Sequence, residues 1–285
     1  MLDLPALNDY IRLICNLVGE GKFRQFIFSP AVVTSAPFAV FSSWINIECF
    51  GFSVYYDLIL GAVGLALIAV VFYRYSLKHT ISLPFYGAVL VCIFSLNKWE
   101  MILNGTGWVH FWTFAAFYFY YLYLDKWYVD QEKNRVNQCV LVILPVLTIL
   151  GIAVFYAAVF AFVTSLFFCI IIVGKKQKKE RIRHEVLFLL SVDLPFLLYA
   201  ICSILQKDTR IVSDGSFFAS IVKDPQFFIR MFTASFSSEV VGVETLLKYE
   251  NGMNAAYILG IFVMLLYGIA LYWNLHGKIY QKTCM

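Results

Sequence analysis

Long runs of apolar residues alternate with short polar segments along most of this chain. A helix that crosses a membrane needs about 20 mostly apolar residues. The runs at 54–73 and 255–275 meet this requirement most clearly, and those at 82–96, 108–124 and 186–205 are shorter or richer in aromatic and polar residues. We interpret all five as spanning helices, because lipid offers no partner for free backbone amides and a helix pairs them internally.

The longest apolar stretch, at 139–173, has room for two short spans with a tight turn near 154–158. The segment 26–47 is less apolar and is either a poor span or a helix at the membrane surface. The segment 231–247 is amphipathic and holds two Glu residues. A short surface helix is expected at 9–18.

Together these segments predict an all-α fold, a polytopic transmembrane helical bundle of about seven or eight spans plus interfacial helices. We expect one integral membrane domain over residues 1–285. Its parts are a surface or interfacial N-terminal segment at 1–52, a main helical bundle at 53–205, an outer loop with an amphipathic helix at 206–254, and a last span at 255–275.

The composition supports a membrane-embedded chain. Apolar residues make up 61% of it and charged residues 14%, whereas soluble domains carry about 25% charged residues. The 28 Phe and 18 Tyr suit helix packing and the membrane–water interface. Basic residues are confined to short loops next to the predicted spans, which gives no support for nucleic-acid binding. Membrane lipids are the partners that this composition predicts.

The four most basic loops fall on one side of the predicted topology, as expected for cytoplasmic loops. The strongest marker is 174–185, which carries six of them. Three more basic loops share that side if 231–247 does not cross the membrane fully. They are the loop around Arg74 and Lys78, 126–135, and 276–282. The outward-facing regions are then 48–56, 97–107 and 206–254.

Motifs of soluble enzymes and of metal sites are missing from the sequence. The seven Cys are widely spaced without a CxxC pair, and the four His lack the spacing of metal ligands. We therefore predict no disulfide framework and no metal site. The chain also has no P-loop, no GxGxxG motif and no Ser-centred nucleophile elbow.

Asp193 is the most prominent ionisable residue inside a predicted span, a position that is costly and often functional. It lies roughly 12 Å along its helix at 1.5 Å per residue. Pro195, two residues later, frees a backbone carbonyl and is expected to kink the helix. The carboxylate could bind a cation, relay protons or orient a substrate. The alternative is a structural bond to a Tyr or a backbone group of a neighbouring helix.

A second group of candidate residues lies at the predicted outer mouth of the spans, within 97–110. It combines a carboxylate, an ammonium group, two indoles and an imidazole. The carboxylate could act as a base, and an indole could stack on a sugar ring. The alternative is an interfacial belt of Trp with ordinary polar caps. The candidates are Lys98, Trp99, Glu100, Trp108 and His110.

Three stretches carry a resemblance to a known family. The first is Phe-Arg-Gln-Phe-Ile-Phe-Ser-Pro at 23–30, which leads to a span that begins with Tyr55-Tyr56-Asp57. The second is Leu-Asn-Lys-Trp-Glu at 96–100, which precedes an aromatic span. The third is the segment 227–243, which precedes the last span. In this order they resemble bacterial polytopic membrane proteins with the architecture of C-type (GT-C) glycosyltransferases.

The resemblance implies a polyprenyl-phosphate-linked sugar as donor, no other cofactor, and the bacterial cytoplasmic (inner) membrane. Such enzymes carry a catalytic acidic residue in the outer loop that follows their first span. No convincing span precedes residue 26 here, which implies a chain without the family's first helix, and Asp9 is the nearest match to the acidic residue.

The leading hypothesis is a membrane-embedded, glycosyltransferase-like protein acting on lipid-linked sugars in envelope glycan assembly or modification. A carboxylate would take the proton from an acceptor hydroxyl, and Lys98 or Arg230 would offset charge on the phosphate leaving group. The alternative is a transporter or a non-catalytic structural membrane subunit. The candidate catalytic carboxylates are Glu48, Asp57 and Glu100.

Overall fold

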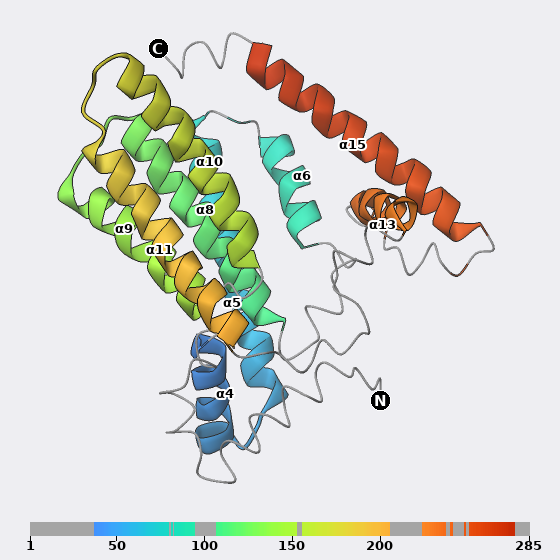
Figure 1. The fold of residues 1–285 in the computed structure, drawn as a ribbon. Coiled ribbons are helices and arrows are strands. Elements are labelled where there is room, and N and C mark those ends of the chain that lie inside the picture. The colour runs from blue at the N-terminus through green and yellow to red at the C-terminus, as the bar shows by residue number, and fades with distance from the viewer. Residues whose placement is uncertain are drawn as a thin grey trace. The chain divides into compact units, whose positions relative to one another are not determined.

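The computed structural model describes residues 37–79, 81, 83–94, 107–152, 156–205, 224–237, 240–241, 248 and 251–276. In this part of the chain every regular element is a helix (Figure 1). The helices are α4 (Pro37–Phe50), α5 (Val54–Lys78), α6 (Leu83–Ile93), α8 (Trp108–Tyr128), α9 (Arg135–Gly151), α10 (Tyr156–Gln177), α11 (Arg183–Leu205), α13 (Pro225–Ser237) and α15 (Gly252–His276).

The chain divides into two compact units. Unit 1 comprises Met1–Ser82 and Met101–Asp208, and unit 2 comprises Leu83–Glu100 and Thr209–Met285. Unit 1 therefore holds α4, α5 and α8 to α11, while unit 2 holds α6, α13 and α15. The expected single domain over 1–285 stays a prediction.

The aromatic helix α8 is the central element of unit 1. It packs against α5 on one side and α9 on another, and its rings reach α10 and α11. Phe117 stacks on Phe160 of α10 with ring centroids 4.3 Å apart, and Trp127 meets Phe188 of α11 edge-on at 5.2 Å. Tyr120 is fully buried among these helices. Because large rings bury much apolar area and pair in preferred geometries, this helix supplies the core of the unit.

Helices α5 and α8 approach closely at Gly64. A Cβ on Gly64 would lie 2.9 Å from both Phe111 Cβ and Trp112 Cδ1, so only hydrogen fits there. One turn away, the indole of Trp112 donates to the Leu60 carbonyl at 2.9 Å. Small residues at helix interfaces in membranes permit such close backbone approach.

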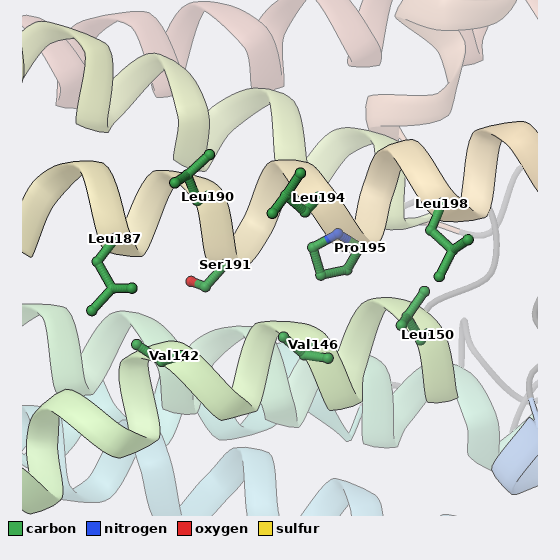
Figure 2. A pocket seen from close by; sticks show the side chains of 9 residues that line it. All are labelled: Val142, Val146, Leu150, Leu187, Leu190, Ser191, Leu194, Pro195 and Leu198. Carbon is green, nitrogen blue, oxygen red and sulfur yellow. The ribbon is translucent and has the colours of Figure 1, made fainter.

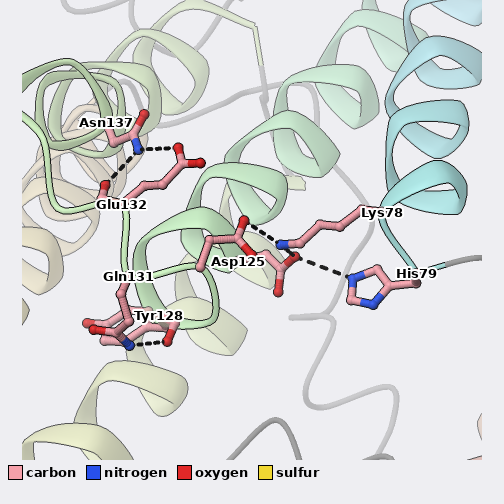
Figure 3. A network of polar contacts seen from close by, with 8 residues as sticks. Lys78, His79, Asp125, Tyr128, Gln131, Glu132 and Asn137 are labelled. Carbon is pink, nitrogen blue, oxygen red and sulfur yellow. Dashed lines mark hydrogen bonds and ion pairs between the residues drawn. The ribbon is translucent and has the colours of Figure 1, made fainter.

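Ion pairs mark one end of the unit 1 bundle, which we call the basic end (Figure 3). Lys78 at the end of α5 contacts Asp125 near the end of α8, and it also lies 2.8 Å from Asp130. Lys175 of α10 pairs with Glu185 of α11 at 2.7 Å. Three of the four basic segments therefore lie together at this end, as the charge pattern predicted. They are the end of α5 and the loops 126–135 and 174–185.

Within unit 2, α13 packs on α15 at a very close contact. A Cβ on Gly260 would lie 1.9 Å from the Thr233 carbonyl oxygen. Thr233, Ala234 and Ser237 form the buried face of α13, while its Phe227 and Phe232 are more than half exposed. At 13 residues, α13 is too short to cross a bilayer core of about 30 Å.

Helix α13 begins earlier than the sequence pattern suggested. The amphipathic helix was predicted at 231–247; the described helix runs from Pro225 to Ser237, and residues 238–239 and 242–247 of the predicted segment lie outside the described residues. Asp224 supplies the reason, because its carboxylate accepts a hydrogen bond from the Phe227 amide at 3.0 Å and Pro225 follows it at a position that favours a helix start. The two Glu residues at 239 and 244 lie outside the described residues.

Four of the described helices are long and apolar enough to cross a membrane, which makes this an integral membrane protein. They are Val54–Lys78, Tyr156–Gln177, Arg183–Cys202 and Gly252–Ile269. Helix α9 is apolar but shorter. The predicted break in 139–173 is close to the observed one, since α9 ends at Gly151 and α10 begins at Tyr156. The count of seven or eight spans is not confirmed.

We predict that Gly64→Ala destabilises unit 1 by about 1–3 kcal/mol, because overpacking forces backbone or ring shifts. The Phe111 Cβ is held close to its own backbone, and the Trp112 ring is tied to Leu60. Unfolding in detergent micelles measures the effect.

Gly61→Ala is the matched control for this substitution. A Cβ there would meet Trp108 Cβ at 3.8 Å, an ordinary contact. Equal stability of the two variants would show that the close α5–α8 approach does not constrain the bundle.

Candidate functional site

Asp57 lies at the end of unit 1 opposite the basic end, in the first turn of α5. The chain reaches it through a tight turn after α4. Gly51 and Phe52 both have a φ of 60° there, a left-handed conformation that glycine adopts easily and phenylalanine rarely. The turn is closed by a hydrogen bond from the Phe52 amide to the Asn46 carbonyl, 3.0 Å.

The side chain of Asn46 holds this turn against α5. Its amide nitrogen donates to the Ser53 carbonyl at 3.1 Å and to Asp57 Oδ2 at 3.0 Å. Its Oδ1 accepts from the Ser53 amide at 2.9 Å. Asn46 is 1% exposed, so both ends of a buried amide are paired, as buried polar groups require.

Trp108 is the second donor to Asp57. It is the first residue of α8, is 6% exposed, and its side chain hydrogen bonds to the Asp57 carboxyl. Its ring meets Trp112 edge-on, with centroids 6.5 Å apart, and the same small cluster includes Ala39 of α4. Three helices therefore meet around one oriented carboxyl group.

This arrangement gives Asp57 a defined orientation and neutral partners. A carboxylate accepts up to about four hydrogen bonds, so two donors leave lone pairs for a further donor such as a hydroxyl group. The side chain is also favoured electrostatically at the N-terminus of α5. The same contacts serve a purely structural purpose, because they join α4, α5 and α8.

The other candidate residues are distributed over the molecule. Glu48 is exposed at the end of α4. His110 lies on α8 but faces α10, where its ring meets Tyr156 at 5.4 Å. Arg230 is exposed on α13 and belongs to unit 2. Lys98, Trp99 and Glu100 lie outside the described residues. Of the candidates, Asp57 and Trp108 are the pair found in contact.

Trp108 contributes to the site in a different way from the one proposed for it. Stacking on a sugar needs an accessible ring face, and this ring is buried between α4, α5 and α8. Its side chain instead lies close enough to the Asp57 carboxyl group to interact with it. A stacking role for Trp108 stays a prediction that would need the ring to move.

Asp193 lies in the middle of α11 and contacts the neighbouring helix α10. Its Oδ1 accepts a hydrogen bond from the hydroxyl of Ser165. The sequence suggested a Tyr or backbone partner as the structural alternative, and the partner is a serine instead. Pro195 lies inside the same helix, which continues to Leu205. The bond joins two candidate spans through a pair of polar side chains.

No group of three or more His, Cys, Asp or Glu residues suited to a metal ion occurs among the residues that the structure describes. The ion-pair cluster of Lys78, Asp125 and Asp130 was not recognised from the sequence, nor was the role of Asn46. The sequence signal for Asn46 was a polar residue within the apolar segment 37–50. Its partner Asp57, eleven positions later, could not be deduced without knowledge of the turn between α4 and α5.

These observations define an integral membrane protein built from helices, with an oriented carboxyl group at the end of one bundle. Comparisons of the chain with protein-family models, curated proteins and solved structures find no match.

We predict that Asn46→Ala lowers the free energy of unfolding by about 2–4 kcal/mol, because it leaves buried backbone and carboxyl groups without partners. Ser42→Ala is the control, since Ser42 shares one 3.1 Å hydrogen bond with the Tyr56 hydroxyl and its loss should cost about 1 kcal/mol or less. Chemical unfolding in micelles compares them. Similar values for both variants would contradict the importance of Asn46.

Proposed function

We propose that this protein is a membrane-embedded, glycosyltransferase-like enzyme that acts on a lipid-linked sugar, with Asp57 as its principal carboxylate. Envelope glycan assembly or modification in a bacterial cytoplasmic membrane is the setting. The observation that carries the proposal is the Asp57 carboxyl group, held by Asn46 and Trp108 at a helix start.

The location of Asp57 supports the proposal. It lies on a candidate span and at the end of unit 1 away from the Lys78 and Lys175 ion pairs. Cytoplasmic segments are the ones enriched in Lys and Arg, so the basic end faces the cytoplasm and Asp57 lies near the outer face. A donor carried on a membrane lipid presents its sugar at that depth.

The chemistry is an inverting transfer. Asp57 accepts the proton of the acceptor hydroxyl as a general base, while the acceptor oxygen forms a bond to the anomeric carbon. The bond from that carbon to the lipid phosphate breaks, and the phosphate leaves with the electron pair. The charge that develops on the leaving phosphate is offset by a positively charged or hydrogen-bonding partner.

We predict that Asp57→Asn reduces sugar transfer by about 100-fold or more, since removal of a general base has effects of this size. The Asn side chain keeps the shape and a hydrogen-bonding oxygen, so the fold should persist. Mass spectrometry of envelope glycans and lipid-linked sugars in a deletion strain, complemented with each variant, measures transfer.

Glu48→Gln is the matched carboxylate control, because Glu48 is exposed on the preceding helix. The deletion strain should accumulate the polyprenyl-phosphate donor or lack one sugar. An unchanged profile in that strain, or full activity of Asp57→Asn, would remove the enzymatic proposal.

Transport is the second candidate function, and the Asp193–Ser165 bond between α10 and α11 is the observation that favours it. An ionisable side chain between spans is a common part of ion and proton pathways. Pro195 interrupts the backbone hydrogen bonding of the same helix. A non-catalytic structural subunit would use the same bond only to join the helices.

If transport is the activity, purified protein in liposomes should dissipate an imposed proton or cation gradient, and Asp193→Asn should abolish this. The Asn oxygen still accepts from Ser165, so stability should change by less than about 1 kcal/mol. If liposomes with the wild-type protein keep the gradient for as long as liposomes without protein, transport of that ion is excluded.

A further inference from the structure

An apolar groove runs along the outside of unit 1 between α9 and α11 (Figure 2). Its volume is about 420 Å³, and nearly all of its lining is hydrocarbon. The side chains that line it are Val142, Val146 and Leu150 of α9 and Leu187, Leu190, Ser191, Leu194, Pro195 and Leu198 of α11. The single hydroxyl among them, on Ser191, shares its one proton between the backbone carbonyls of Phe188 at 2.7 Å and Leu141 at 3.3 Å. The groove therefore suits an alkyl chain rather than a polar ligand.

The length of the groove matches one leaflet of a bilayer. From Leu187 to Leu198 a helix rises roughly 16 Å at 1.5 Å per residue, and half of a hydrocarbon core about 30 Å thick is about 15 Å. Figure 2 shows Leu187 and Val142 at one end of the groove and Leu198 and Leu150 at the other. Since α9 and α11 both start at the basic end, the groove starts close to that end.

Two arginines lie on the helix faces that lead into this end of the groove. Arg183 precedes Leu187 by one helical turn and Leu190 by two turns. Arg135 precedes Val142 by two turns. Each arginine therefore lies on the same face of its helix as residues that line the groove. Both arginines are exposed. Within the described residues, no ion pair joins either arginine to a carboxylate.

The neighbouring charges strengthen the cationic character of this end. Lys175 is paired with Glu185, which is 2% exposed. The next cations in the connection between α10 and α11, including Lys178, Lys179 and Arg181, are exposed. A guanidinium group binds phosphate oxygens in a planar, bidentate manner. An apolar groove with two such groups on the helix faces that lead into its end is complementary to a molecule with a phosphate head and an alkyl tail.

We propose that the α9–α11 groove binds an anionic phospholipid of the adjacent leaflet, with one acyl chain in the groove and the phosphate headgroup between Arg135 and Arg183. The site is independent of the Asp57 site, which lies at the other end of unit 1. The proposal predicts that the protein retains an anionic lipid selectively, rather than attracting anionic lipids in general to a charged surface.

Lipid retention by the purified full chain tests the proposal. The protein is reconstituted in bilayers of phosphatidylcholine and phosphatidylglycerol with matched acyl chains, extracted gently, and analysed by native mass spectrometry. The double variant Arg135→Gln/Arg183→Gln should lower the preference for phosphatidylglycerol by roughly 30-fold, because each basic residue at the surface contributes about fivefold. Both side chains are exposed, so folding is expected to be unchanged.

Lys178→Gln/Lys179→Gln is the control of equal charge, on residues in the turn that follows α10. It should change the preference less than the arginine variant does, because these lysines add to the general attraction of the surface but do not lie on a helix face that leads into the groove. Val146→Phe tests the apolar part, because the added ring fills the groove and should reduce retention of the anionic lipid while leaving both arginines in place.

Three results would overturn the proposal. The first is an unchanged preference in the arginine variant, and the second is an equal loss in the lysine control, which would indicate diffuse electrostatic attraction. The third is displacement of the bound lipid by soluble glycerol phosphate as effectively as by phosphatidylglycerol, which would show a headgroup site without use of the groove.

Discussion

The requirement that backbone polar groups inside a bilayer be paired within the protein is the constraint on which this structure depends. Pro145 in α9 has no amide hydrogen, so the Leu141 carbonyl loses its usual partner four residues later. The Ser191 hydroxyl of α11 lies 3.3 Å from that carbonyl and shares its proton between it and the Phe188 carbonyl at 2.7 Å. A local defect in one helix thereby becomes a link between α9 and α11, at the floor of the groove. The two described helices of unit 1 with an internal proline, α9 and α11, both take part in this contact.

Several buried side-chain polar groups follow the same rule, although the buried Tyr120 hydroxyl has no hydrogen-bond partner among the described residues. Glu185 is buried but contacts Lys175 and the Tyr128 hydroxyl, and Asn46 uses both its donor and its acceptor. Asp193 contacts Ser165 instead of an ion of opposite charge. A hydrogen bond between helices in a membrane contributes on the order of 1 kcal/mol. Such bonds therefore add little stability, and the packing of the α8 rings against α10 and α11 contributes more of it.

Hydrophobic periodicity was sufficient to locate most helices but not their ends or their polar contacts. The runs at 54–73 and 255–275 correspond to α5 and α15, and 139–173 divides into α9 and α10 as expected, because a span length and a break are local properties. Helix α13 was displaced in the prediction, since the Asp224 cap outweighs the apolar pattern that follows it. The Asn46–Asp57 contact depends on a turn with positive φ at Phe52, which composition does not reveal.

The two ends of unit 1 satisfy their carboxylates by different means, and this difference has a consequence for orientation. At the basic end Asp125 and Glu185 pair with lysines. At the other end Asp57 is held by an amide and an indole, which are neutral donors. A lysine at that position would hold the carboxylate more strongly, but it would also place a cation on the side that the positive-inside rule keeps poor in Lys and Arg. Neutral donors preserve the charge asymmetry, and they leave the carboxylate unneutralised and able to accept a further hydrogen bond.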